Sequence, residues 1–195
     1  INRNVEAAVF ENDAAAILND GLAYDRCTVG IVTDLGGIEA LAKHDVHDAD
    51  QLLKVLRTQV DVVLADGVAV LNAGDERVAA LARLCDGGVV LYSMDEHAPP
   101  LQAQREAGAR AVFLRGGDCV LAEGPAETVL PRLGPLSAQA ETLPPEALLA
   151  AVAAAWAMGI VADLITAGVQ TFGPAPVSAR ASTPHAVFDD RKAAD

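Results

Sequence analysis

Short apolar runs alternate with amphipathic stretches through the first half of the chain, and this alternation constrains the fold more than any other feature. The apolar runs at residues 5–10 (VEAAVF), 28–33 (TVGIVT), 68–71 (VAVL) and 89–92 (VVLY) are typical of strands buried on both faces. Residues 13–22, 48–60 and 75–85, which separate them, carry apolar side chains at helical spacing. This order predicts an α/β fold with a mostly parallel sheet flanked by helices.

The second half of the chain follows a different pattern. Residues 111–115 and 119–122 flank the turn Gly116-Gly117 and predict a hairpin, and residues 128–133 predict one more strand, so we expect a small antiparallel sub-sheet near residues 109–133. Pro144-Pro145 precedes a predicted helix over residues 146–158, and a shorter one follows at 162–167. Residues 173–195 are rich in Pro, Ala and Ser and predict a linker and the start of a following domain.

Composition narrows the function classes. The 195 residues are 52% hydrophobic, which is enough for a sizeable core, and the formal net charge of −13 argues against a nucleic-acid partner. No apolar run reaches the roughly 18 to 20 residues that a membrane span needs, so no membrane partner is expected. The three cysteines, Cys27, Cys85 and Cys119, form no CxxC pair, which predicts buried free thiols in a reducing cytoplasm.

Several segments resemble one known family. Residues 9–27 (VFENDAAAILNDGLAYDRC) are similar to the VLETARGGILREGLGFDRC stretch in the Mur-ligase-like half of cyanophycin synthetases. The similarity continues in order through residues 29–35 (VGIVTDL), 69–78 (AVLNAGDERV) and 146–160 (EALLAAVAAAWAMGI), over nearly all of residues 1–172. It implies the central domain of a Mur ligase, in which ATP and Mg²⁺ activate a carboxylate as an acyl phosphate. The family's GxxGKT/S phosphate loop precedes this segment, so we expect residues 1–172 to be a fragment without that loop.

The resemblance also implies site residues. Glu11 falls at the family's Mg²⁺-binding glutamate, and Glu39 falls beside a second metal position. Asn72, Asp75 and Asp34 fall at positions expected near the nucleotide. Interpretations without a ligand stay open for three of them: a solvated acid at a strand end for Glu11, and a hydrogen-bonded turn for Asn72 and Asp75.

Other family positions carry side chains that cannot perform the chemistry. The metal-binding histidine is replaced by Ala40, the lysine that Mur ligases often carbamylate by Leu56, and two arginines and an asparagine by Ala14, Pro184 and Ala147. His44 and His47 lie nearby at i, i+3 spacing, which suits a metal pair, but the polar sequence around them favours a loop before a helix.

Three functional hypotheses follow. The first is a non-catalytic Mur-ligase-like domain, a pseudoenzyme that binds no cofactor in this chain and contacts other domains or subunits of its parent protein, with a homo-oligomer as one arrangement. The second is part of a cytoplasmic ATP-dependent ligase that joins aspartate and arginine. The third is an acidic module that binds cations or basic partners, for which scattered acids such as Asp45 are usually only a solvated surface.

Overall fold

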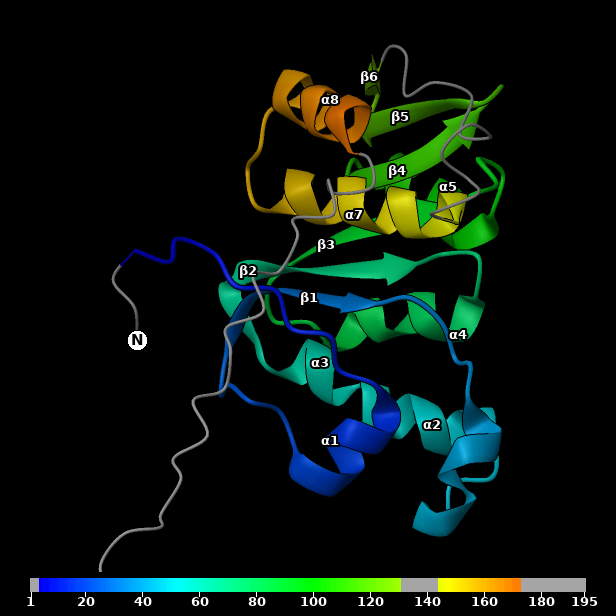
Figure 1. The fold of residues 1–195 in the computed structure, drawn as a ribbon. Helices are drawn as coiled ribbons and strands as arrows, with labels where there is room; N and C mark the ends of the chain where they lie inside the picture. Colours follow the sequence, from blue (N-terminus) through cyan, green and yellow to red (C-terminus); the bar gives the residue numbers. More distant parts are fainter. Residues whose placement is uncertain (1–3, 131–143, 173–195) are drawn as a thin grey trace, which may run out of the picture.

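A six-stranded sheet in the order β1-β2-β3-β4-β5-β6 forms the centre of the molecule (Figure 1). The computed structural model describes residues 4–130 and 144–172. β1 to β4 are parallel, whereas β5 and β6 continue the sheet antiparallel. The strands are β1 (Cys27–Val32), β2 (Val63–Asn72), β3 (Gly88–Ser93), β4 (Arg110–Arg115), β5 (Asp118–Glu123) and β6 (Ala126–Leu130). The predicted α/β class, with its antiparallel sub-sheet, is confirmed.

Helices cover both faces of this sheet and enclose two hydrophobic cores. One face carries α1 (Ala14–Asp20), the 3-10 helix η1 (Ile38–His44), α2 (Ala49–Leu56), α3 (Thr58–Asp61), α4 (Glu76–Ala79), the 3-10 helix η2 (Ala80–Leu84) and α5 (Pro99–Glu106). The other face carries α7 (Pro145–Ala157) and α8 (Ala162–Thr171). Because side chains alternate along a strand, Leu71 and Leu91 enter the first core, while Val70 and Val90 enter the second.

α7 is the helix that closes the second core. Pro145 lies in its first turn, where the missing N–H costs nothing, and Gly159 follows its end at a φ of 81°. Leu149, Val152 and Ala153 are fully or almost fully buried against β1 to β4. Hence the alanine-rich segment is a core helix. No helix within the two described ranges is long and apolar enough to cross a membrane.

The strand predicted at residues 5–10 is wrong. These residues form no ladder with the sheet, and Val9 is 92% exposed. A strand needs a neighbour to pair its N–H and C=O groups, and an apolar sequence alone does not supply one. Glu11 therefore follows an irregular segment and precedes the Asp13 cap of α1; it does not end a strand.

The predicted hairpin is confirmed. Gly116 and Gly117 have φ values of 59° and 94°, the left-handed pair that a two-residue turn between right-twisted strands requires. β6 covers part of the strand predicted at residues 128–133. The rest of that prediction, and the linker with Pro184, lie outside the described residues.

Two helical segments are absent from the sequence prediction. η1 is short, and α5 (PPLQAQRE) buries a single large apolar residue, Leu101, so neither shows a clear apolar stripe. Pro99 at the start of α5 is the sequence feature that could have indicated this helix, because proline is favoured in the first turn. The predicted helices at residues 48–60 and 75–85 are present, each divided into two consecutive pieces.

The three thiols differ in their surroundings. Cys119 is buried in the second core, and this burial raises the pKa of its thiol to about 12. Cys27 and Cys85 are only half-buried, so the prediction of buried thiols holds for Cys119 alone. We expect a maleimide or iodoacetamide reagent at pH 8 to label Cys119 at least about tenfold more slowly than the other two, because the thiolate is the reactive form.

Peptide mapping of partly labelled native protein measures these rates, with urea-unfolded protein as the control in which the three thiols become equivalent. Labelling of Cys119 in the native protein at the rate of Cys85 contradicts the burial that the structure assigns to it.

Candidate functional site

A polar cluster lies where the parallel strands end. The carboxyl ends of β1, β2 and β3 meet at the same edge of the sheet, which is where open α/β sheets generally bind ligands. Thr33 and Asp34 follow β1, Asn72 ends β2, and Tyr92 pairs with Asn72 from β3. Glu146, in the first turn of α7, completes this carboxyl-edge cluster.

Asn72 connects three parts of the chain and is 5% exposed. Its Nδ2 donates to the Thr33 carbonyl at 2.8 Å and to Oε1 of Glu146 at 2.6 Å. Its Oδ1 accepts from the Gly74 N–H at 2.8 Å, which forms the turn between β2 and α4. The side-chain amide thus uses both its donor and its acceptor inside the protein, and it fixes the start of α7 to the sheet.

Tyr92 differs from Asn72 because its polar atom has no partner. Its side chain is fully buried, and its hydroxyl makes no hydrogen bond with any described residue. Burial raises the pKa of Tyr92 well above its ordinary value, and the negative charges of Glu146 and Asp34 raise it further. The apolar sequence of β3 did not indicate that the Tyr92 hydroxyl would be buried without a partner among the described residues.

The two aspartates expected near a nucleotide are engaged in local turns. Asp34 accepts from the Gly36 N–H at 2.8 Å through Oδ1 and from the Thr33 hydroxyl at 2.9 Å through Oδ2. Asp75 caps α4 by accepting from the Arg77 N–H at 2.8 Å. Asn72, Asp75 and Asp34 thus follow strand ends at one edge, and each has an internal hydrogen bond.

The positions expected to bind metal are dispersed. Glu11 and Glu39 are exposed, the first before α1 and the second in η1. Within the described ranges, no group of three or more His, Cys, Asp or Glu side chains could hold a metal ion. Ala40 is exposed and Ala147 half-buried, whereas Leu56 and Ala14 are buried in the first core.

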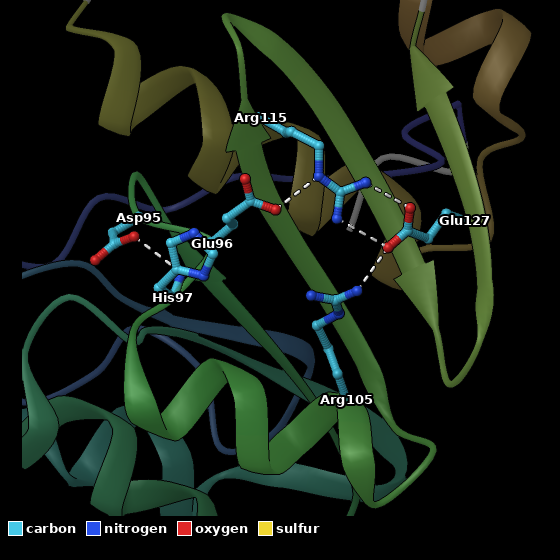
Figure 2. Close-up of polar contacts among 6 residues, drawn as sticks. All are labelled: Asp95, Glu96, His97, Arg105, Arg115 and Glu127. Carbon is cyan, nitrogen blue, oxygen red and sulfur yellow. Dashed lines mark hydrogen bonds and ion pairs between the residues drawn. The ribbon is translucent and has the colours of Figure 1, made fainter.

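A second polar cluster, which no sequence pattern indicated, joins α5, β4 and β6 (Figure 2). Glu127 accepts from Arg105 at 2.6 Å and from two nitrogens of Arg115 at 2.7 and 3.1 Å. Glu96 accepts from the Arg115 Nε at 2.6 Å. Both guanidinium groups also lie near the Phe113 ring, at 4.6 and 5.1 Å from its centroid. This arginine cluster is balanced in charge and attaches β6 to the rest of the sheet.

The arginine cluster should make the free energy of unfolding depend on pH in a predictable direction. Hydrogen bonds from Arg115 hold the pKa of Glu127 below its ordinary value. A lowered folded-state pKa gives a contribution that is present above the ordinary glutamate pKa and is lost as the pH falls through the folded-state pKa. We expect Glu127→Gln to lower the free energy of unfolding by about 1 kcal/mol at pH 7, and this loss to shrink towards pH 3.

Urea unfolding at a series of pH values measures the difference, and Glu106→Gln, an exposed glutamate in α5, is the matched control. A loss that stays constant from pH 7 to pH 3 would show that the carboxylate charge is not its source.

The fold and the carboxyl-edge cluster define the class: an α/β domain whose polar side chains gather where parallel strands end. No family model matches the chain. Its curated homologues are named cyanophycin synthetase, and they include those of Synechocystis sp. (35% identical over 86% of this chain), Crocosphaera subtropica (32% over 86%) and Geminocystis herdmanii (31% over 87%). Each alignment covers 20% of the homologue, so the chain spans about one fifth of the length of these relatives.

Proposed function

We propose that residues 1–172 form a non-catalytic, Mur-ligase-like domain of a cyanophycin-synthetase-like protein. Its role is structural, or it binds other domains and subunits of the same parent, including further copies in a homo-oligomer. The parent acts in the cytoplasm, and this domain uses neither ATP nor Mg²⁺ for catalysis. The similarity to part of much longer synthetases supports a role within a larger protein.

The observation that carries the proposal is the internal use of the polar side chains at the candidate nucleotide positions. The side-chain amide of Asn72 donates to the end of β1 and to α7, and its oxygen accepts from the β2–α4 turn. Asp34 and Asp75 stabilise turns beside it. A nucleotide base that used Asn72 would have to displace a 2.6 Å charge-assisted hydrogen bond to Glu146, which is among the stronger contacts of the domain.

The substituted positions support the same conclusion. Leu56 lies in the first hydrophobic core, where an apolar side chain stabilises the fold and a charged amine would be costly. Ala14 is also buried there, at the start of α1. Ala40 offers no metal ligand. Apolar side chains have therefore taken over positions at which catalysis by this family would need charge.

A second candidate is a working part of an ATP-dependent amino-acid ligase that joins aspartate and arginine. The retained Glu11, together with homologues named cyanophycin synthetase, favours it. In that case Glu11 would hold Mg²⁺ against the phosphates in the transition state, and its carboxylate would be essential.

The two candidates predict different effects of Glu11→Gln in the complete parent protein. A non-catalytic domain leaves the ATP-dependent rate of amide formation unchanged, and Glu6→Gln, an exposed glutamate in the same segment, behaves identically. A catalytic domain loses about a hundredfold or more in rate with Glu11→Gln alone. That loss, with normal folding by circular dichroism, overturns the proposal.

A further inference from the structure

An open groove lies between two helical segments on the face of the sheet that carries the first core. Its volume is about 530 Å³, and Leu91 of β3 lines it from the sheet. Short side chains of α4, η2 and α5 form most of its apolar walls: Ala79, Ala80, Pro99, Pro100 and Ala103. A hollow of this size with a mostly apolar lining is typical of a site that takes an apolar group. The short side chains leave room for larger ones from a partner.

The wall formed by α4 and η2 has the spacing of a helix face and a charge at each end. Glu76, Ala79, Ala80 and Arg83 lie at i, i+3, i+4 and i+7, so they share one side of this helical stretch. Neither charged side chain belongs to any of the four ion pairs of the described residues. The Arg83 Nε donates only to the Ala80 carbonyl of its own helix, at 3.4 Å. The groove thus offers a cation to an acidic partner.

α8 carries a second apolar stripe, which the described residues leave largely uncovered. Its inner side packs against α7 and β6. Val161, Leu164 and Phe172 are 60, 63 and 56% exposed. With Gly168 they are spaced by three or four residues, so they lie along one side of the helix. Asp163, the only charged residue of α8, lies at the flank of this stripe and belongs to no ion pair of the described residues.

We propose that α8 of one copy of this chain docks into the groove of a second copy, with Asp163 beside Arg83. The chain's own α8 cannot fill the groove, because it packs against α7 and β6 on the opposite face of the sheet (Figure 1). Large apolar side chains on a helix then meet a groove of small ones, which is a recurrent mode of recognition. The charges are complementary as well, since an acid at the flank of the stripe meets a cation at the end of the groove.

This contact joins two different surfaces, so each copy in a pair keeps one of them free. Copies therefore assemble into a closed ring or an open chain and not into an isolated two-fold dimer. The inference rests on the binding role in the proposed function, and it names the partner and the two surfaces that meet.

Sedimentation velocity of the 195-residue chain over a range of concentrations tests the contact. Because one short helix supplies most of it, we expect a dissociation constant of about 10–100 μM and a sedimentation coefficient that rises beyond that of a dimer. A chain that stays monomeric up to about 500 μM overturns the proposal.

Two variants test the two surfaces separately. Leu164→Glu places a charge on the stripe of α8, and Ala103→Trp fills the groove from an exposed position of α5. Each should weaken assembly at least about tenfold. Leu18→Glu in α1 and Gln102→Trp in α5, also at exposed positions, are the matched controls and should assemble normally. Circular dichroism checks that every variant is folded.

A mixture of the two variants distinguishes this contact from other modes of assembly. Copies with Leu164→Glu keep an intact groove, and copies with Ala103→Trp keep an intact α8. Each variant alone should be monomeric, whereas an equimolar mixture should form a one-to-one complex. Self-association of the Ala103→Trp variant at the unmodified affinity, or a mixture that stays monomeric, overturns the proposal.

A charge exchange tests the placement of Asp163. Arg83→Asp should weaken assembly about fivefold, and the added change Asp163→Arg should restore it, because the reversed charges are again complementary. Assembly that stays weak in the double variant overturns this placement. Loss of the contact would leave the absence of ATP use untouched, whereas a rise in melting temperature with Mg²⁺-ATP would count against the proposed function and not against the contact.

Discussion

Replacing Asn72 with alanine is expected to lower the free energy of unfolding by about 3 kcal/mol. The variant loses two donated hydrogen bonds and one accepted one at a position that is 5% exposed. It also leaves the Thr33 carbonyl and the Gly74 N–H without these partners. Since these bonds join β1, the β2–α4 turn and α7, their loss should lower the stability of the whole domain. Urea unfolding followed by circular dichroism measures it.

Two further variants separate the hydrogen bonds from the volume of the side chain. Asn72→Asp keeps the shape and the acceptor, but it cannot donate and places a carboxylate against Glu146; it should be at least as destabilising at pH 7 and partly recover near pH 4. Asn19→Ala, at an exposed position of α1, should change stability little. A cost below about 1 kcal/mol for Asn72→Ala would contradict the connecting role given to Asn72.

Replacing Gly30 with alanine is the second change with a large expected effect, a loss of about 3 kcal/mol. Gly30 lies in β1, where an added Cβ would collide with the backbone carbonyl of Gln59 and approach Cγ2 of Val63 to 2.7 Å. The Gln59 carbonyl belongs to α3, so the helix could move only by losing its packing against the sheet. The absence of a side chain at position 30 is thus what allows α3 to lie so close to β1.

Gly168→Ala is the matched control for this change. Gly168 lies inside α8, and an added Cβ there meets nothing within 4 Å. Alanine is the better helix former, so this variant should gain about 0.5–1 kcal/mol. If the Gly30→Ala variant is as stable as the unmodified protein, α3 does not pack as closely on β1 as described above.

The sequence predicted the sheet well because strands buried on both faces carry continuous apolar runs. The runs at residues 28–33, 68–71 and 89–92 overlap β1, β2 and β3, and the glycine pair identifies the hairpin by the φ values it permits. Residues 5–10 show the same apolar pattern but have no neighbour to pair with in the structure. Composition describes what a segment prefers, whereas pairing depends on residues far away in the chain.

The candidate site was predictable only in part. Asn72, Asp75 and Asp34 were identified because the segments that contain them resemble those of cyanophycin synthetases, and the structure places them at the edge where the parallel strands end. The role of Tyr92 could not be predicted, because an apolar strand that contains a tyrosine does not indicate whether its hydroxyl reaches water or a partner. The arginine cluster could not be predicted either. Its members are separated by up to 31 positions, and Glu127 reaches the arginines through the antiparallel pairing of β4, β5 and β6.

The measurement that tests the central claim most directly is a thermal-shift titration of this domain with Mg²⁺-ATP at constant free Mg²⁺. A non-catalytic domain predicts no change in melting temperature between zero and 1 mM Mg²⁺-ATP. A dissociation constant near 10 μM would instead stabilise the fold by about 2.7 kcal/mol at that concentration, which is roughly 5 to 10 °C for a chain of this size. A nucleotide-dependent rise of that size would contradict the claim.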